Sequence, residues 1–542
     1  MSKAISYKDA LKKYKPLEER EPAVEKLSTE ELLNQYHPDY YQDAMVTLKV
    51  GPNKGDRCHR QLADVLQSDA RIDEADLAGA PVRQTDILVI GGGGAGCAAA
   101  LVAEKAGARV TLATKLRLGD SNTVMAEGGI QASIDREDTP QAHYQDTMKA
   151  GHFNSNKQLV AGLATDAPEV IRWLIQQGMQ FDLDQYGDLL LRRAGGTSAD
   201  RVAYYRDYTG LEMMRVLREA VTNSSIEVMD YSPAVELLSN QDGNCAGAVV
   251  SSLKDCSYEL IKAKAVIIAT GGIGRMHLDS FPTSNHFGAT GDGLVLAYRL
   301  GAKMLNLDSF QYHPTGLAHP HHLAGFLITE GIRSAGAYLL NAEGNRFVDE
   351  LKTRDHVSSA ILKECAEGRG IQASEDAQGV WLDTPGLELR SPGLMEQRFP
   401  KLLQLGNKCG IDPRETPLLI YPTLHYQNGG VEIDENGQSS VPGLYCVGEV
   451  SGGIHGRNRI MGNALLDIIC FGRRAGAHAV EHSRRPGHKK ISIDHLSSLR
   501  RTLTIAEMPM DLKGPMLFPE CSKFEADSDY DGLRRKTSAP RN

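Results

Sequence analysis

Short apolar runs that end in glycine recur along this chain. The first spans Thr85 to Gly96 (TDILVIGGGGAG), and later ones cover 265–272 (AVIIATGG) and 443–449 (GLYCVGE). Runs of four or five apolar residues have the length of a buried strand, and glycine is typical of the turn that follows. A small-residue helix over 97–106 and a second strand over 109–113 complete a β-α-β unit. This order of elements predicts an α/β fold.

One amphipathic helix is predicted over 167–177. Asp166 is placed to cap its start, Pro168 lies in its first turn, and Gly178 follows its end. Its apolar face, which is expected to pack on a sheet, consists of Val170, Ile171, Leu174 and Ile175.

The glycine turn after the first strand has G-x-G-x-x-G spacing, with Gly91, Gly93 and Gly96 at the marked positions. In a β-α-β unit these glycines tighten the turn, admit a pyrophosphate to the backbone and let the helix pack on the strand. The N-terminus of the helix then offers free N–H groups to the phosphates. The sequence therefore predicts a dinucleotide-binding site.

Composition narrows the choice of partners. The 542 residues are enough for two or three domains, and the net charge of −9 without a dense Lys/Arg stripe argues against nucleic acid. No apolar run approaches the roughly 18 residues that span a bilayer, and the polar N-terminus is unlike a signal peptide. The nine cysteines lack C-x-x-C or C-x-x-H spacing. We therefore expect no metal or iron–sulfur site built by this chain alone, and a cytoplasmic location.

Changes in composition divide the chain into five expected parts. They are an N-terminal extension (1–84), the first part of a nucleotide-binding domain (85–310), an inserted domain richer in His and Pro (311–420), the second part of the nucleotide-binding domain (421–485) and a C-terminal tail (486–542). In the extension, Ser28 and Glu31 have capping-box spacing at the start of a helix. The extension either docks a partner protein or packs against its own chain; the residues leave both alternatives open.

Four polar clusters outside the glycine turn combine polar groups with glycine in ways that a plain core would not need. Taken singly, each has a structural explanation: a His-Pro pair is often a turn, and Glu and Arg three apart often form a surface pair. The clusters are His313-Pro314-Thr315-Gly316, Thr329-Glu330-Gly331-Ile332-Arg333, Thr353-Arg354-Asp355, and His425-Tyr426 with His455-Gly456-Arg457-Asn458-Arg459.

Together and in this order, the clusters resemble the flavoprotein subunits of fumarate reductase and succinate dehydrogenase, and their relative L-aspartate oxidase. The resemblance spans about 85–475 and includes SNTVMAEGGI at 121–130, TGDG at 290–293, GEV at 448–450 and GNALL at 462–466. It implies a split Rossmann-like FAD-binding domain with an inserted α+β capping domain. That arrangement agrees with the change in composition over 311–420.

The resemblance implies that the dinucleotide is FAD. Membrane-bound members attach FAD through the His of a Ser-His-Thr triplet, but this chain has Asn122 at that position, so we expect non-covalent FAD. The second strand ends at Thr114-Lys115 rather than at an acidic residue, as in the succinate dehydrogenase and aspartate oxidase branch. The residues implied in FAD binding are Gly91, Gly93, Gly94, Ala95, Gly96, Thr114, Lys115, Ser121, Asn122, Thr123, Gly128, Gly129, Ala269, Thr270, Gly271, Asp292, Glu449, Asn463, Ala464 and Leu465.

The resemblance also implies a dicarboxylate held between FAD and the capping domain. A substrate with two carboxylates needs cationic or donor groups at both ends. Arg459 and His425 match the positions that hold one carboxylate, and His313 and Thr329 match those at the other. Held at both ends, the double bond is polarised and one carbon lies near the flavin, which supplies a hydride while an acid protonates the next carbon.

Arg354 matches the family's proton donor, with Glu330 and Arg333 as its relay. Arginine normally stays protonated, so this role requires rapid reprotonation through the carboxylate. The assignment of this role rests on the resemblance alone.

The segment Arg193-Ala194-Gly195-Gly196 departs from the family. Fumarate reductases resemble Arg-Phe-Gly-Gly there, and aspartate oxidases Arg-Glu-Gly-Gly, whose Glu meets the substrate amine. Ala194 lacks that carboxylate, which argues against aspartate. Loss of the Phe predicts either a wider pocket or altered packing by Tyr204, Tyr205 or Arg206.

The leading hypothesis is therefore a flavoprotein subunit that interconverts fumarate and succinate. The resemblance implies a separate iron–sulfur subunit, which would place the chain in the cytoplasm or beside a membrane through its partners. Free reduced flavin, reduced nicotinamide and a small thiol remain alternative electron donors. The alternative functions are an L-aspartate oxidase, or an FAD electron-transfer subunit without dicarboxylate turnover.

Overall fold

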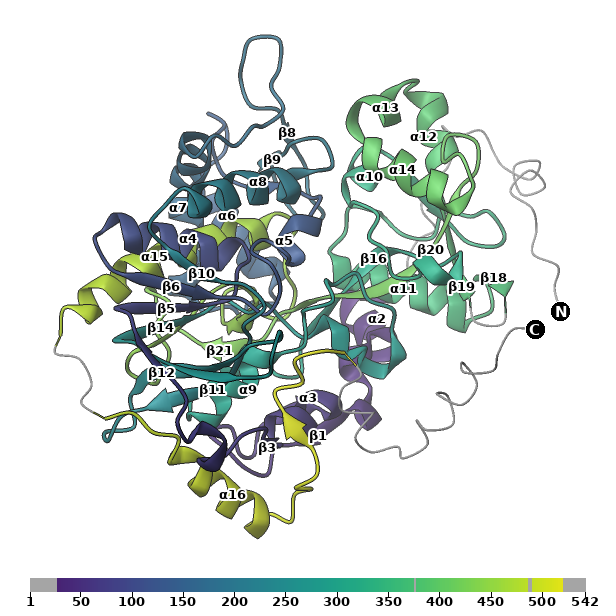
Figure 1. Ribbon diagram of the computed structural model, residues 1–542. Coiled ribbons are helices and arrows are strands. Elements are labelled where there is room, and N and C mark those ends of the chain that lie inside the picture. The colour runs from purple at the N-terminus through teal and green to yellow at the C-terminus, as the bar shows by residue number, and fades with distance from the viewer. Residues whose placement is uncertain (1–26, 375–376, 486–489, 520–542) are drawn as a thin grey trace, which may run out of the picture.

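A five-stranded parallel sheet forms the centre of the larger lobe in this computed structural model, which describes residues 27–374, 377–485 and 490–519 (Figure 1). Its strand order is β10 (Glu227–Met229), β6 (Val110–Ala113), β5 (Ile87–Ile90), β14 (Ala265–Ile268) and β22 (Leu444–Cys446). Every residue of the four strands from β6 to β22 is buried. Burial on both faces explains why the sequence shows continuous apolar runs rather than alternation. The predicted α/β fold is confirmed.

Helix α4 (Gly94–Lys105) follows β5 and packs against α15 (Asn463–Ser483) on the sheet. It begins at Gly94, three residues before the expected start, with Gly93 as its N-cap. The glycines at its start are therefore helical residues, and the helix N-terminus lies directly at the turn.

The helix predicted over 167–177 was wrong at its start. Helix α7 runs over Lys157–Gln176, and the Asn156 side chain caps it by accepting from two backbone N–H groups. Pro168 lies inside this helix, and Asp166 pairs with Arg474 (Oδ2 to Nε, 2.8 Å) instead of capping. Packing against α6 (Pro140–Ala150) and α15 stabilises the helix across the proline, whose missing N–H would otherwise favour a helix end.

The smaller lobe is built on an antiparallel sheet in the order β16 (Phe310–Leu317), β20 (Leu418–Gln427), β19 (Ala377–Asp383) and β17 (Tyr338–Leu340), with β18 (Ile371–Ser374) beside β19. Helix α11 (Arg354–Ala366) packs on this sheet. The lobe has its own apolar core, which includes Leu339, Ile361 and Ile420. Strand β20 passes through the expected boundary at 420, and the proposed division into domains remains a prediction.

The remaining elements extend these two lobes. A second sheet joins β11 (Ala234–Ser239), β12 (Cys245–Ser251), β13 (Tyr258–Lys262) and β4 (Val82–Gln84). Other helices and strands are α5 (Asn122–Met125), α8 (Thr209–Thr222), α9 (Asp292–Arg299), α10 (Gly331–Ser334), α12 (Thr384–Arg390), α13 (Leu394–Arg398), α14 (Pro400–Cys409), β7 (Ile130–Gln131), β8 (Leu191–Arg192), β9 (Val202–Ala203), β15 (Met304–Leu305), β21 (Gly430–Glu432) and β23 (Ser451–Gly452).

The described parts of both termini pack against their own chain. Helix α2 (Thr29–Tyr36) starts with the predicted capping box of Ser28 and Glu31 and packs on α11 of the smaller lobe. Strands β1 (Met45–Thr47) and β2 (Arg57–His59) lead to α3 (Arg60–Leu66), which packs on α9 of the larger lobe. After α16 (His495–Ile505), β24 (Lys513–Gly514) pairs with β3 (Asp69–Ala70).

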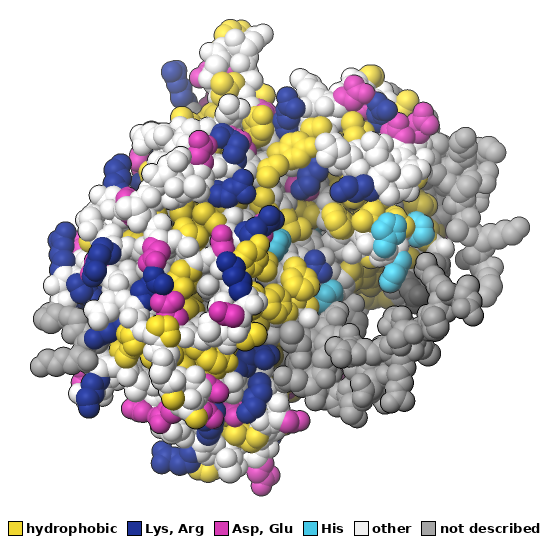
Figure 2. Space-filling model, viewed as in Figure 1, with side chains coloured by type: hydrophobic (Ala, Val, Ile, Leu, Met, Phe, Trp, Pro, Cys, Tyr) yellow, Lys and Arg dark blue, Asp and Glu magenta, His cyan; other side chains and the backbone are white. Residues whose placement is uncertain are grey.

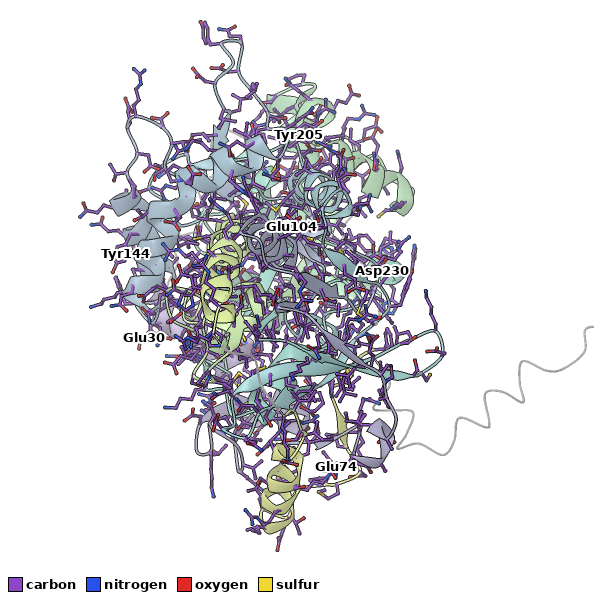
Figure 3. All side chains as sticks on the ribbon, turned by 60° about the vertical axis from the view of Figure 1, so that its left-hand side comes forward. Glu30, Glu74, Glu104, Tyr144, Tyr205 and Asp230 are labelled. Carbon is purple, nitrogen blue, oxygen red and sulfur yellow. The ribbon has the colours of Figure 1, made fainter. Side chains whose placement is uncertain are left out.

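Figure 3 shows how far the N-terminal segment reaches, because its labelled residues Glu30 and Glu74 lie on different sides of the molecule. Of the two alternatives for the extension, packing against its own chain describes residues 27–84. The rest of the extension and the end of the tail lie outside the described residues.

Within those residues, no helix has the length and apolar character needed to cross a membrane. On the face seen in Figure 2, Lys and Arg side chains are scattered rather than gathered into a stripe.

Candidate active site

A large cavity is formed by residues from both lobes. It holds about 1590 Å³ of space between atoms, part of it open to solvent. The start of α4 and the ends of β6 and β14 line one part, and His313, Arg354, His425 and Arg459 line another. The sequence-predicted residues line this cavity with three exceptions: Gly96, Asn463 and Arg333.

The glycine turn leaves no room for side chains. Gly91 has φ +119°, and a Cβ atom there would lie 2.3 Å from the carbonyl oxygen of Ala269. A Cβ atom on Gly96 would lie 1.9 Å from the carbonyl oxygen of Gly91, so this glycine serves helix–strand packing rather than the cavity surface. The N-terminus of α4 therefore opens onto the cavity, which fits the pyrophosphate of a dinucleotide.

Lys115 and Asp292 form an ion pair where β6 ends and α9 begins. The Lys115 Nζ lies 2.6 Å from Asp292 Oδ2, and both side chains are largely buried. Lys115 also donates to the Thr290 hydroxyl at 2.7 Å. In a Rossmann-type unit the end of the second strand meets the ribose of the dinucleotide, so this pair fits the adenosine part of FAD.

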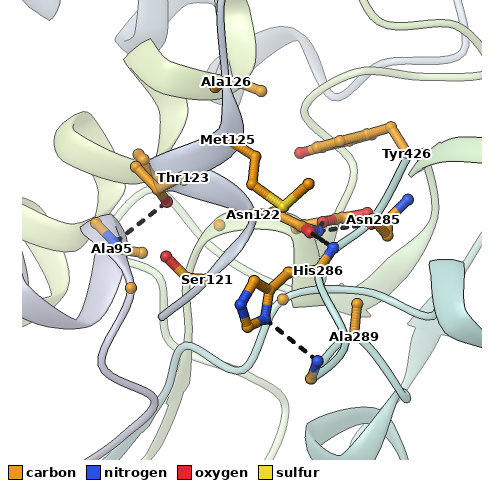
Figure 4. Close-up of a pocket in the computed structure, with 18 of the residues that line it drawn as sticks. Ala95, Ser121, Asn122, Thr123, Met125, Ala126, Asn285, His286, Ala289 and Tyr426 are labelled. Atoms are coloured by element: carbon orange, nitrogen blue, oxygen red, sulfur yellow. Dashed lines mark hydrogen bonds between the residues drawn. The ribbon is translucent and has the colours of Figure 1, made fainter. Parts of the chain in front are cut away.

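The amide of Asn122 is engaged in a network with its neighbours (Figure 4). Its Nδ2 donates to Asn285 Oδ1 at 2.6 Å and to Glu449 Oε2 at 3.2 Å, and its Oδ1 accepts from the His286 N–H at 2.6 Å. Burial raises the pKa of Glu449. Because a carboxamide is not a nucleophile and all three bonds stay within the protein, the arrangement fits a flavin held without a covalent link.

Asn463 has a structural role instead of facing the cavity. Its Oδ1 lies 2.8 Å from His143 Nε2, and its Nδ2 donates to the Thr147 hydroxyl at 3.0 Å. The residue begins α15, whose next residues Ala464 and Leu465 do line the cavity.

Two neutral histidines, His313 and His425, face each other in the part of the cavity that Arg354 and Arg459 also line. We call this part the substrate end. Their ring centres are 5.0 Å apart, and burial lowers the pKa of both His313 and His425 well below the usual value, with Arg354 adding to the effect. The Nδ1 atom of His313 accepts from the Thr315 N–H at 3.2 Å, so its proton lies on Nε2. His425 Nδ1 lies 2.7 Å from the Ser284 hydroxyl.

Arg459 is a buried cation that forms no ion pair with the residues that the structure describes. Its guanidinium lies 4.3 Å from the ring centre of Tyr426, and no carboxylate of the described residues comes within ion-pair distance. Burial and then the charge of Arg354 lower the pKa of Arg459 to about 9, which leaves it charged at neutral pH. Burying an unpaired charge is costly, so the site fits an anionic ligand.

Arg354 is held by a buried carboxylate and an amide. Its Nε lies 2.7 Å from Glu330 Oε2, and its Nη1 donates to Gln311 Oε1 at 3.0 Å. Arg333 stands behind this pair, with Nη2 3.3 Å from Glu330 Oε2, which explains why it does not line the cavity. Burial alone would raise the pKa of Glu330, but Arg354, Arg333 and the Gly195 N–H bring it down to about 2. Glu330 is therefore ionised at neutral pH, and its charge holds the Arg354 guanidinium in place.

Thr329 lines the cavity beside this pair. Its hydroxyl oxygen accepts from the Gly331 N–H at 3.3 Å, which leaves the hydroxyl hydrogen for a ligand.

Gln311 is a site residue that sequence reasoning missed. Besides accepting from Arg354, its amide nitrogen donates to Asn458 Oδ1 at 2.8 Å and to the Arg459 carbonyl oxygen at 2.6 Å. It therefore links the two arginines. Its position two residues before His313 on β16 was the available signal, since alternate residues of a strand share a face.

The space near Ala194 is filled. Ala194 is 1% exposed and packs with Ala150, Val202, Ile460 and Met461, and of this group only Met461 lines the cavity. The neighbouring Gly195 N–H donates to Glu330 Oε1 at 2.8 Å. This loop therefore positions the Glu330 carboxylate, and Ala194 does not widen the cavity.

The FAD binding domain family matches residues 86–465 of this chain. A fumarate reductase (CoM/CoB) subunit from Methanothermobacter marburgensis is 38% identical over 419 residues, covering 75% of this chain and 74% of the relative. An L-aspartate oxidase of Streptomyces coelicolor is 34% identical over 451 residues, covering 77% and 76%. The chain belongs to this family of FAD-dependent oxidoreductases.

The same family supplies the structural neighbours. A chain of E. coli quinol fumarate reductase superposes with a TM-score of 0.71 at 30% identity, covering 78% of this chain and 75% of that one. A chain of Mycobacterium smegmatis Sdh1 gives a TM-score of 0.66 at 35% identity, covering 78% and 73%. The predicted resemblance and the split Rossmann-like FAD-binding fold are confirmed, and FAD is the cofactor of the family. Relatives named for fumarate and for aspartate match about equally well, so they do not select a substrate.

Proposed function

We propose that this chain binds FAD non-covalently and reduces fumarate to succinate. The observation that carries the proposal is the charge at the substrate end. Arg354 and Arg333 share one carboxylate, Glu330, and Arg459 is buried without an ion pair to any described residue. The excess of positive charge matches a substrate with two carboxylates.

The substrate end has hydrogen-bond donors for both carboxylates of fumarate. Arg459 and His425 hold one carboxylate, and His313, with its proton on Nε2, holds the other together with Thr329. FAD, when reduced, supplies a hydride to one carbon of the double bond. Arg354 gives a proton to the neighbouring carbon and is reprotonated through Glu330, so two electrons and two protons convert fumarate to succinate.

An aspartate oxidase fits this cavity less well. A substrate ammonium group needs a free carboxylate, but Glu330 pairs with Arg354, Glu127 pairs with Lys401 at 2.6 Å, and Glu449 accepts from Asn122 and the Gln427 N–H. An aspartate ammonium would therefore compete with bonds that already exist. A pure electron-transfer subunit would have no use for Arg459 and the two histidines.

In the proposed reaction, FAD has to be reduced again by an electron donor after each turnover. Among the described residues, no cluster of His, Cys, Asp and Glu could hold a metal ion. A separate iron–sulfur subunit is the donor we propose, with reduced flavin, reduced nicotinamide and a small thiol as the alternatives for the assay.

The test is anaerobic fumarate reduction by the purified holoprotein with reduced viologen dye, beside L-aspartate with oxygen. Dye oxidation that depends on fumarate supports the proposal. Consumption of aspartate selects the oxidase, and silence with both substrates selects the electron-transfer subunit. Acid denaturation of the same sample should release all of the flavin into solution; flavin that stays with the chain would refute the non-covalent link.

A further inference from the structure

The last described residues of the chain return to the FAD cavity. We call residues 513–518 the C-terminal strap. β24 at its start pairs with β3, and Lys513 Nζ lies 2.5 Å from Asp69 Oδ2. The carbonyl oxygen of Gly514 accepts from Arg299 Nη1 at 2.9 Å. In Figure 1 this yellow segment runs back from α16 past α3 toward the centre of the molecule.

The end of the strap lies on the ion pair at the adenosine end of the cavity. The Leu517 N–H donates to Asp292 Oδ1 at 3.2 Å, and the Thr290 hydroxyl lies 3.3 Å from the Leu517 carbonyl oxygen. The Phe518 ring packs on Phe287 with ring centres 5.9 Å apart.

Phe518 also covers Lys115, whose Nζ lies 5.8 Å from the ring centre. Only 12% of the Lys115 side chain and 9% of the Asp292 side chain are exposed. An ion pair shielded from water keeps its geometry better than an exposed one, because solvent screens the attraction. Removing the strap would take one hydrogen bond from Asp292 and let water reach Lys115.

We propose that Leu517 and Phe518 are positioning residues that hold the Lys115–Asp292 pair and thereby keep FAD in its cavity. The strap acts through Lys115 and Asp292, which line the cavity. It does not contact the substrate end. This role does not depend on which dicarboxylate the protein uses.

Two truncations test the proposal. A chain that ends at Met516 lacks Leu517 and Phe518 but keeps β24, whereas a chain that ends at Pro519 keeps the whole strap and is the matched control. We expect the shorter holoprotein to release FAD about tenfold faster, measured as the fluorescence of free FAD after dilution, and the control to match the full chain. Equal release from both truncations would overturn the proposal.

Point variants separate retention of FAD from a general loss of stability. Phe518→Ala and Phe287→Ala should each speed FAD release, and the double variant should add little, because the two rings act together. Ile505→Ala on α16, which removes a side chain that is 77% exposed, is the control and should change nothing. The proposal requires the FAD-free variants to melt at the temperature of the FAD-free parent. If a variant lowers the melting temperature of the FAD-free protein as much as it lowers that of the holoprotein, the two rings have a structural role only. That result would overturn the proposal.

Discussion

The two ends of the cavity are stabilised in opposite ways. At the dinucleotide end, Gly91 and Gly96 allow backbone segments to pack closely against one another. The charges of Lys115 and Asp292 there neutralise each other within the protein. At the substrate end Arg459 is buried without a carboxylate of the described residues, and two neutral histidines share the wall with it. One end is complete as folded, and the other gains a partner for its charge only when an anion binds.

This difference separates what each end contributes. Residues of the dinucleotide end should affect FAD affinity and stability in the same direction. A buried unpaired cation, by contrast, costs folding free energy in order to bind substrate. Removing the charge of Arg459 should therefore raise stability while it impairs substrate binding.

The largest effect is expected for Arg354→Gln. The variant keeps a hydrogen-bonding side chain but has no transferable proton of the right acidity, so turnover of fumarate should fall by about 1000-fold or more. The flavin spectrum and FAD content should stay unchanged. Arg390→Gln, on an exposed arginine of the smaller lobe, is the control. A residual rate near that of the parent would remove Arg354 from the mechanism.

Arg459→Met should separate function from stability. Loss of a charge-assisted contact to a substrate carboxylate should raise KM for fumarate by about 30-fold or more. The KM of Arg459→Lys should lie between those of the parent and Arg459→Met. Because methionine removes the buried charge, the melting temperature without substrate should rise. A fall in melting temperature would show that protein groups already stabilise the guanidinium. It would contradict the claim that the charge of Arg459 gains a partner only when an anion binds.

Lys115→Met should give the reverse pattern at the dinucleotide end. It leaves Asp292 without its cation, so FAD should bind about tenfold more weakly, as measured by titration of the FAD-free protein. KM for fumarate of the FAD-saturated variant should not change. A change in KM without a change in FAD affinity would contradict the separation of the two ends.

The smallest effect on function is expected for Glu127, which lines the cavity and pairs with Lys401, because its ionisation bears on stability. Burial raises the pKa of Glu127 from its usual 4.5 to about 7, and Lys401 opposes the shift. The folded state thus binds more protons than the unfolded state between these values, and the free energy of unfolding falls as pH rises from about 4.5 to about 7.

Glu127→Gln should lack this component, which is at most about 3 kcal/mol, in denaturant unfolding measured across that range. Glu137→Gln, on an exposed turn, should keep the parent's pH dependence. A Glu127→Gln profile parallel to that of the parent would show that Glu127 ionises normally.

Much of the site could be predicted from the sequence because its signals are local. The glycine spacing from Gly91 to Gly96 predicts the turn. The polar clusters, taken in order, predict His313, Arg354 and Arg459, which all line one cavity. The start of α7 could not be predicted, because Pro168 suggested a first turn while tertiary packing carried the helix across it. Propensity is a weak guide where tertiary packing overrides it.

Contacts between distant segments left no local signal. The bond from the Gly195 N–H to Glu330 depends on how the two lobes meet. The filling of the space beside Ala194 by Ile460 and Met461 joins segments of the larger lobe that are more than 200 positions apart. The contact of Leu517 with Asp292 joins residues 225 positions apart. From the sequence, that segment was expected only to belong to a C-terminal tail that docks a partner protein or covers its own domain.

The most direct measurement is the binding of succinate and of butyrate to the oxidised holoprotein, followed by the change in the flavin spectrum. The two ligands differ by one carboxylate, so they test whether the substrate end requires two negative charges. We predict that succinate binds about 100-fold more tightly or better, and that Arg459→Met removes most of this difference. Equal affinities, or a preference that survives Arg459→Met, would contradict the assignment of this cavity to a dicarboxylate.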